Sequence, residues 1–269
     1  MHSAISGKTE ESSRAIAALG VFGRFIFALA IIAVGLETWL FAHSVGHPLG
    51  RAYDALNLIP WLPAIPWLAY FAGAIWIACG VGMLGERTAA PAAIVLCALF
   101  VLCALVIVAP VYLRHLGSIP ARTVFLEPIA IGCVGVLIPA RGAVPQWLAA
   151  AARYVFAISL VVFGVDHLIG LAFHASFVPW WLPWHTFWAA LFGVAFIAAA
   201  ISIAFRVLER WGAAGLGLMF GIWVLTLHLP RVLGYLNGGG LRDADEWSSM
   251  LIAAAIWGGA WALAGNPEE

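Results

Sequence analysis

The sequence predicts an all-α integral membrane protein in which eight transmembrane helices form two parallel four-helix repeats. Of its 269 residues, 64% are hydrophobic and only 10% are charged, whereas soluble proteins are about half apolar and about a quarter charged. The apolar residues gather in runs of roughly 20, the length that crosses a bilayer as a helix. These runs recur in a similar order in the two halves of the chain. A lipid bilayer is therefore the expected surroundings of most of the chain.

Eight apolar segments reach or approach the length of a membrane span. They cover residues 24–43, 65–84, 90–112, 123–139, 150–173, 185–205, 212–233 and 247–264. The fourth is short and has Glu127 and Pro128 near its outer end, where a proline is tolerated because the first turn of a helix leaves its N–H groups without partners. The first begins after Arg24, contains Glu37 and has no small-residue cleavage site behind it. We therefore interpret it as a mature helix and not as a signal peptide.

The two halves of the chain resemble each other. GRFIFALAIIAVGLETWLFAH in the first half aligns with ARYVFAISLVVFGVDHLIGLAFH in the second, so that Glu37 falls on Asp166. Further along, Pro110 falls on Pro230. We divide the chain into a first repeat, residues 1–140 with a short cytoplasmic N-terminal tail, and a second repeat, residues 141–269. Because four spans return the chain to the side where it started, the repeats are parallel.

The distribution of Lys and Arg predicts the orientation. With the N-terminus inside, the inner flanks hold eight of these 13 residues and the outer loops hold five, and positive charge favours the cytoplasmic side. We expect a multi-pass protein of the bacterial inner membrane with both termini in the cytoplasm. The formal net charge is zero, so no basic field favours a nucleic-acid partner.

The spacing of the cysteines and histidines does not match the ligand pattern of a metal site. Four cysteines lie within apolar segments and form no C-x-x-C motif: Cys79, Cys97, Cys103 and Cys133. We interpret them as small buried thiols at helix contacts. His43 and His47, in the first outer loop, offer too few ligands for zinc.

The candidate site lies in residues 159–188, where an apolar span carries adjacent acidic and imidazole side chains. A carboxylate near the centre of a membrane helix costs roughly 2.5–3.5 kcal/mol on insertion scales, so Asp166 should face protein or water and have a partner. A rise of about 1.5 Å per residue places Asp166, His167 and His228 in the outer half of the bilayer. His167 and His174, seven residues apart, share one helical stripe. Arg231 lies at the end of the seventh span, at a similar depth. The candidate catalytic residues are therefore Asp166, His167, His228 and Arg231.

A loop rich in Trp and Pro follows this span, and it supplies most of the candidate cofactor-binding residues. These are Trp180, Trp181 and Trp184, with His185 at the start of the sixth span and Glu246 at the start of the eighth. The indole rings would offer a flat apolar mouth. They are equally typical of an interfacial anchor, because indole favours the headgroup level of a bilayer.

Other interpretations of the polar groups stay open. Asp166 with Arg231, and Glu37 with Arg114, would serve only helix packing if they are interhelical ion pairs. His167 and His228 would equally suit a hydrogen bond across the bundle. Axial ligation of a haem by these two imidazoles is disfavoured, because the sequence has no haem fingerprint.

Several motifs together resemble the DoxX-like family of small bacterial membrane proteins, which are built on a four-helix unit. The first-helix motifs are RFIFALAIIAVGLETW and RYVFAISLVVFGVDHL, and the second-helix motifs are AYFAGAIWIACGVGML and ALFGVAFIAAAISIAF, with a Pro-rich outer loop between them. The resemblance covers nearly the whole chain as two copies. It implies a membrane-embedded partner in electron transfer near the quinone pool, since family members include subunits similar to those of thiosulfate:quinone oxidoreductases.

The leading hypothesis is therefore a redox-type inner-membrane protein, the membrane subunit of a quinone-linked oxidoreductase with a redox protein as partner. His167 and His228 would donate hydrogen bonds to a quinone, Asp166 would exchange protons, and Arg231 would hold Asp166 ionised. The alternative is a non-enzymatic scaffold or assembly subunit for an oxidoreductase. A small-solute transporter is less favoured because parallel repeats without clearly broken helices offer no hinge. The sequence leaves open whether the protein forms a homo-oligomer.

Overall fold

The computed structural model describes residues 2–41, 66–112, 114–115, 117–140, 142–236 and 240–266. Within these ranges it describes side chains from residue 18 onward, except at positions 41, 66, 68, 69, 107, 111, 112 and 244. Within these ranges the chain is helical and has no strand. The long helices are α1 (His2–Phe41), α2 (Pro66–Leu84), α3 (Ala89–Cys103), α5 (Ile119–Val136), α6 (Gln146–Ile169), α8 (His185–Phe205), α9 (Glu209–Trp223) and α11 (Ala244–Ala264). The short ones are η2 (Ala104–Val108), α4 (Ala109–Tyr112), α7 (Leu171–Ala175), η3 (Val224–His228), α10 (Leu229–Val232) and η4 (Gly240–Arg242).

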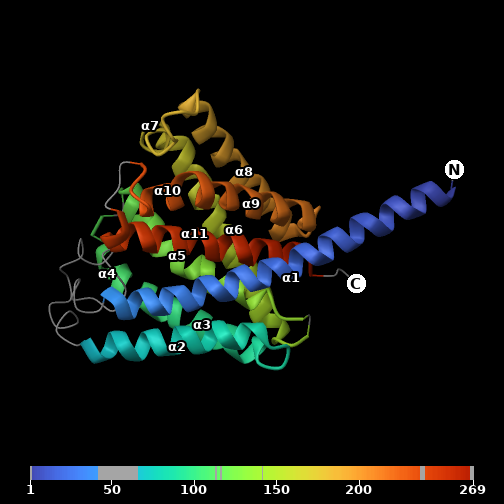
Figure 1. The fold of residues 1–269 in the computed structure, drawn as a ribbon, viewed down its shortest axis with the longest axis horizontal. Helices are drawn as coiled ribbons and strands as arrows, with labels where there is room; N and C mark the ends of the chain where they lie inside the picture. Colours follow the sequence, from blue (N-terminus) through green and yellow to red (C-terminus); the bar gives the residue numbers. More distant parts are fainter. Residues whose placement is uncertain are drawn as a thin grey trace.

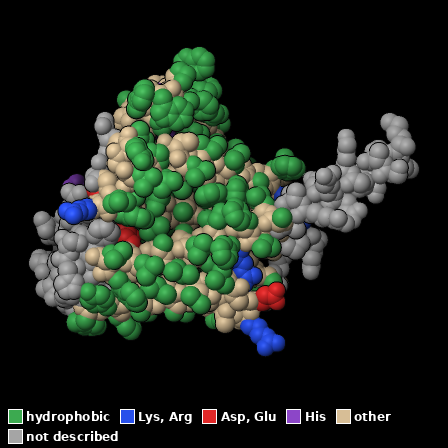
Figure 2. Space-filling model, viewed as in Figure 1, with side chains coloured by type: hydrophobic (Ala, Val, Ile, Leu, Met, Phe, Trp, Pro, Cys, Tyr) green, Lys and Arg blue, Asp and Glu red, His purple; other side chains and the backbone are tan. Residues whose placement is uncertain are grey.

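The protein is an all-α, multi-pass membrane protein, as the composition predicts. Seven helices in the described ranges are long and apolar enough to cross a bilayer: Ala18–Leu40, Ala89–Val106, Ile119–Val136, Gln146–Ile169, His185–Phe205, Glu209–Val232 and Asp245–Ala264. The predicted second span corresponds to α2, whose apolar part, Tyr70–Leu84, is shorter. Hydrophobic side chains cover most of the visible face between the two ends of the molecule, as a lipid-facing surface requires (Figure 2).

The long helices form a closed ring. Each packs against the next in the order α2, α1, α11, α9, α8, α6, α5, α3 and back to α2, and α5 also contacts α11 across the ring. Figure 1 shows the helices running roughly side by side, with the N-terminal part of α1 projecting away from the bundle. The two halves of the chain therefore meet at three helix contacts, α1 against α11, α6 against α5, and α5 against α11.

In each half of the chain, glycines allow the first two helices to cross with their backbones in contact. A Cβ added at Gly35 of α1 would lie 2.6 Å from the carbonyl oxygen of Gly73 in α2. A Cβ added at Gly164 of α6 would lie 2.7 Å from the carbonyl oxygen of Gly193 in α8. Small residues let membrane helices approach this closely, which increases the packing between them.

An arginine near the start of the span binds the end of the neighbouring helix in both halves. Arg24 of α1 donates to the carbonyl oxygen of Met83 at 2.6 Å, and Arg153 of α6 donates to that of Ile203 at 3.0 Å. These carbonyls belong to the last turns of α2 and α8, where helical acceptors have no partner within their own helix. Arg153 also forms a buried ion pair with Glu209 of α9.

Two prolines coincide with π-helical turns. The segment η2 precedes Pro110 and η3 precedes Pro230, and the N–H of the residue before each proline bonds five residues back, Ala109 to Ala104 and Leu229 to Val224. Proline lacks an N–H and its ring clashes with the preceding turn, so the helix widens locally to accommodate it. The helices α3 and α9 thereby continue into α4 and α10 instead of ending.

Candidate functional site

Polar side chains converge at one end of the ring. This end holds the last turns of α1 and α6, the first turns of α5 and α11, and the short helices α7 and α10. On the visible face of Figure 2, charged and imidazole side chains also lie toward the ends rather than the middle of the molecule. The polar groups at this end, called here the polar end, form three separate clusters.

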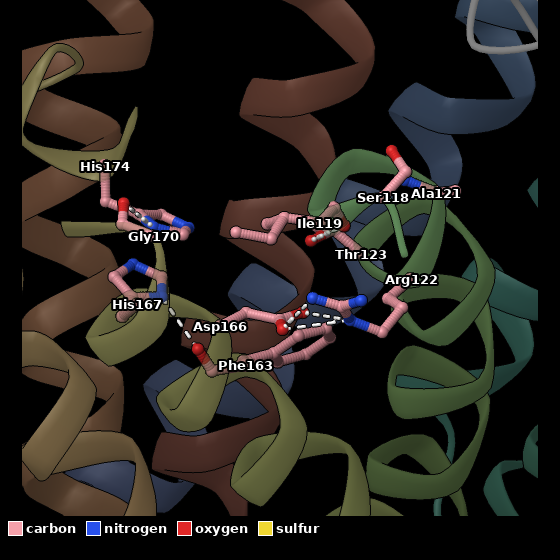
Figure 3. Close-up of polar contacts among 10 residues, drawn as sticks. All are labelled: Ser118, Ile119, Ala121, Arg122, Thr123, Phe163, Asp166, His167, Gly170 and His174. Atoms are coloured by element: carbon pink, nitrogen blue, oxygen red, sulfur yellow. Dashed lines mark hydrogen bonds and ion pairs between the residues drawn. The ribbon is translucent and has the colours of Figure 1, made fainter. Parts of the chain in front are cut away.

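The first cluster is a buried ion pair between α6 and α5. Both carboxylate oxygens of Asp166 accept from Nε of Arg122, at 2.9 and 3.1 Å, and Oδ1 also accepts from Nη2 at 2.5 Å. The side chain of Asp166 is 3% exposed and that of Arg122 is 16% exposed. Figure 3 shows Asp166 directed toward Arg122 on α5, with His167 on its other side. Asp166 thus has the partner that its place in a span requires.

The predicted pairing of Asp166 with Arg231 is wrong. Arg231 of α10 instead binds Glu246 of α11 through three hydrogen bonds of 2.6–2.9 Å. Glu246, predicted to contact a cofactor, therefore neutralises Arg231, whose guanidinium also lies 5.9 Å from the ring centre of Phe177. The pairing differs because α6 packs against α5, whereas α10 packs against α11.

The predicted pairing of Glu37 with Arg114 is also wrong. Glu37 of α1 accepts a hydrogen bond from the hydroxyl of Ser248 in α11, while Arg114 is exposed. The two acids that the sequence aligns nevertheless have equivalent roles. Glu37 and Asp166 each reach from the first helix of their own half to the last helix of the other half.

The second cluster is a stack of imidazole and indole rings. The rings of His167 and His174 are 3.7 Å apart and tilted by 22°, which agrees with the shared stripe that their spacing predicts. His167 also lies 5.9 Å from Trp223 at 12° and 5.2 Å from Phe196. The short helix α7 follows a break at Gly170 and places His174 over His167 (Figure 3).

The backbone fixes the tautomers of both imidazoles. Nδ1 of His167 lies 2.8 Å from the carbonyl oxygen of Phe163, and Nδ1 of His174 lies 3.0 Å from that of Gly170. Since a carbonyl oxygen only accepts, Nδ1 carries the proton in each ring, and in the neutral form Nε2 is a hydrogen-bond acceptor. Burial lowers the pKa of His174 from its ordinary 6.5, although the bond to Gly170 and the charge of Asp166 oppose the shift. His174 is therefore neutral at pH 7.

His228 stands apart from these rings. It ends η3, and its Nδ1 is buried without a hydrogen-bond partner. Among the described residues no ring contact or hydrogen bond joins it to His167, so the structure does not bring together the pair that the sequence suggests as two donors. His228 instead lies one turn before Arg231, in the third cluster, with Glu246 and Phe177.

The predicted tryptophan mouth lies on the surface. Trp180, Trp181 and Trp184 are 80%, 52% and 76% exposed, and His185 opens α8 as predicted. A shallow hollow of about 620 Å³ is lined by Trp184, His185, Thr186 and Phe187. Successive ring contacts connect this hollow to the imidazole stack, through Phe187, Trp188, Phe192 and Trp223.

Sequence reasoning missed Arg122 and Trp223 as site residues. Arg122 lies just before the predicted fourth span, residues 123–139, whereas Ser118 accepts from the N–H of Ala121 and starts α5 at Ile119. An N-cap serine followed by a proline at the second helical position was the available signal. Nothing in the sequence marks Trp223 as a site residue, because a single tryptophan in an apolar span is as typical of a lipid-facing or core position.

No family model, no curated protein and no solved structure matches this chain. A function is therefore argued from the geometry of the three clusters.

Proposed function

We propose that the protein is a redox-type protein of the bacterial inner membrane, the membrane subunit of a quinone-linked oxidoreductase, and that it binds a quinol beside His167 and His174. The observation that carries the proposal is the imidazole stack. Both rings hold their Nδ1 protons against backbone carbonyls, which leaves an Nε2 acceptor on each ring, and the flat indole of Trp223 lies 5.9 Å from the ring of His167.

This arrangement favours the reduced form of the ligand. A quinol donates two O–H hydrogen bonds, which neutral Nε2 atoms accept, whereas the carbonyls of a quinone need donors that these atoms do not supply. On oxidation a quinol loses two protons and two electrons and becomes a quinone. The imidazoles would take up the protons in turn, and a redox group of the partner protein would take the electrons.

Asp166 and Arg122 would set the charge beside the imidazoles. The carboxylate of Asp166 raises the pKa of His174 against the larger effect of burial, so it favours a proton arriving on that ring. The bidentate contact to Arg122 holds the carboxylate in place. Asp166 is thus a positioning and electrostatic residue in this proposal. It does not contact the ligand.

The aromatic side chains support a route from the membrane. The hollow at Trp184 and Phe187 is joined to Trp223 by ring contacts through Trp188 and Phe192. A quinol is flat and apolar, so it would pass along such rings at little cost in desolvation. Trp180 and Trp181, which are exposed, would anchor this face at the headgroup level.

The first test compares quinol affinity between imidazole variants. His167→Ala and His174→Ala should each weaken binding of a short-chain quinol by about tenfold, because a lost hydrogen bond costs roughly 1 kcal/mol and stacking is lost with it. His115→Ala, which removes an exposed imidazole outside the three clusters, is the matched control and should bind as the wild type does. Titration of the purified protein, followed by tryptophan fluorescence, measures the affinities. Equal affinity in all four proteins would refute the site.

The second test is the pH dependence of the same binding. Because burial lowers the pKa of His174 below 6.5, its Nε2 remains an acceptor at pH 7 and becomes a donor only in more acidic solution. Quinol affinity should therefore be constant near neutrality and fall as the pH drops below about 6.5. Quinol affinity that rises on acidification would contradict this and would indicate that an imidazolium donates a hydrogen bond to the ligand.

We also propose that the chain crosses the membrane eight times as two parallel repeats of a DoxX-like four-helix unit. The equivalent glycine crossings, arginine contacts and π-turns in the two halves support a duplication. So does the equivalent contact of Trp76 with Phe100 and of Phe196 with Phe220. In this topology α2 spans the membrane despite its shorter apolar part, and both termini are cytoplasmic.

Single-cysteine labelling in a cysteine-free background tests the eight spans. Glu86→Cys and Ala143→Cys, in the hairpin after α2 and in the linker between the halves, should react with an impermeant maleimide only after the membrane is permeabilised. Gly117→Cys, before α5, should react in intact cells. If α2 does not cross the membrane, the cysteine at position 86 will instead be labelled in intact cells.

A scaffold function is the second candidate, and the ion pairs favour it. The carboxylates of Asp166 and Glu246 are both engaged by guanidinium groups, as helix-packing devices would be. A scaffold predicts that no variant of the imidazole stack changes quinol affinity.

A further inference from the structure

Two of the four cysteines meet where α3 and α5 cross. A Cβ added at Gly132 of α5 would lie 3.0 Å from Cα of Cys97 and 3.4 Å from its Sγ. The next residue in α5 is Cys133, which is buried, and its thiol is hydrogen-bonded to that of Cys97. The sequence suggested four separate packing residues, and only the helix crossing makes two of them a pair.

The crossing brings the two cysteines next to each other. Consecutive Cα atoms are about 3.8 Å apart, so the close approach at Gly132 holds the backbone of Cys133 near that of Cys97. The thiols of the two cysteines interact, and a disulfide between them requires Cα atoms about 4.4–6.8 Å apart and sulfurs about 2.05 Å apart. Because the helices are already in contact here, we expect closure to need movement of the two side chains and not a rearrangement of the helices.

We propose that Cys97 and Cys133 are a redox-active dithiol that closes to an interhelical disulfide between α3 and α5, with a membrane quinone as the oxidant. Two S–H bonds break and one S–S bond forms. The two protons and two electrons pass to the quinone, which becomes a quinol. This inference stands on the helix crossing and does not depend on a ligand site at His167 and His174.

The position of the pair suits an oxidant dissolved in the bilayer. Cys133 lies fourteen residues after Ile119 in α5, which at about 1.5 Å per residue is roughly 20 Å from the polar end. At this depth the thiols lie within the apolar band, where a quinone dissolves and a hydrophilic thiol reductant does not. Cys97 is half-buried and Cys133 is buried, so an oxidant in the bilayer would meet Cys97 first.

The test counts free thiols in the purified full-length protein after incubation with duroquinone. The ring of this quinone is fully substituted and does not add thiols, so any thiol lost to it has been oxidised. After denaturation, free thiols are tagged with a maleimide that shifts the mass of the protein. The wild type should fall from four tags to two, and a dithiol reductant should restore all four. Peptide mass spectrometry should then find Cys97 linked to Cys133.

Four serine variants, one for each cysteine, show which two thiols are oxidised. Cys97→Ser and Cys133→Ser should each keep three tags, whereas Cys79→Ser and Cys103→Ser should each fall from three tags to one. Four tags on the treated wild type would overturn the proposal. Oxidation by diamide but not by duroquinone would overturn the quinone as oxidant.

His167→Ala separates this proposal from the proposed quinol site. Its thiols should be oxidised by duroquinone as fully as those of the wild type. Loss of oxidation in this variant would contradict the independence of the dithiol, and loss of quinol binding alone would bear only on the imidazole stack.

Discussion

Asp166→Asn should destabilise the protein by about 3–5 kcal/mol, because it removes the buried carboxylate that the guanidinium of Arg122 binds. The side chain of Asp166 is 3% exposed, and this pair joins the two halves of the chain at the contact of α6 with α5. Unfolding by sodium dodecyl sulfate in mixed micelles, followed by tryptophan fluorescence, measures the loss. An asparagine variant as stable as the wild type would show that the pair contributes nothing.

Two further variants separate the loss of a partner from the loss of charge. The double variant Asp166→Leu with Arg122→Leu removes both charges and should recover much of the stability, since two apolar side chains replace a buried ion pair at little cost. Glu246→Gln is the matched control at the polar end. Its pair with Arg231 is more exposed, at 24% and 10%, and the loss should be smaller, because a more solvated pair contributes less.

Because Asp166 contributes to the stability of the fold, its variants are poor probes of the proposed quinol site. If Asp166→Asn loosens the junction of the two halves, a change in quinol affinity reports on the fold as well as on the site. The imidazoles of His167 and His174 touch the proposed ligand position without carrying a helix contact of this strength. They are therefore the better probes of function.

Gly258→Ala should cost about 3 kcal/mol or more, because the backbones of α11 and α1 leave no room for a side chain. An added Cβ would lie 2.7 Å from the carbonyl oxygen of Gly23 and closer still to the amide nitrogen of Phe27. Backbone atoms cannot rotate away, so the two helices would have to separate along the second junction of the halves. The same unfolding titration measures the change.

Gly215→Ala is the control for this prediction. A Cβ at Gly215, on the exposed side of α9, meets nothing within 4 Å. Alanine is a better helix former than glycine by about 1 kcal/mol, so this variant should be at least as stable as the wild type. Equal stabilities for the two alanine variants would mean that α1 and α11 do not depend on backbone contact.

Much of the fold was predictable from the sequence because the signals are local. A span is recognised by the length and hydropathy of one run of residues, and no neighbour is needed to read it. Predicted and observed bounds agree closely for α8, which was expected at residues 185–205 and runs from His185 to Phe205. The first helix differs most. It begins at His2, well before Arg24, since helix propensity does not stop at the edge of the apolar run.

The sequence predicted the depth of the candidate site along the helices, but only some of the contacts between its side chains. The sequence placed Asp166, His167, His228 and Arg231 at one end of the protein, and the structure places them there in three clusters. Depth along a helix follows from residue number alone. The direction in which a side chain points around the helix axis becomes meaningful only when the neighbouring helices are known.

The sequence by itself determined a multi-pass, all-helical membrane protein with acids late in two aligned spans, because these properties depend on residues close together in the chain. The tertiary structure decided the partners. Arg122 and Arg231 lie at a similar level, and only the order of helices in the ring brings α5 to Asp166 and leaves α10 to Glu246. The same long-range packing stacks His174 and Trp223 on His167 and joins Cys97 to Cys133.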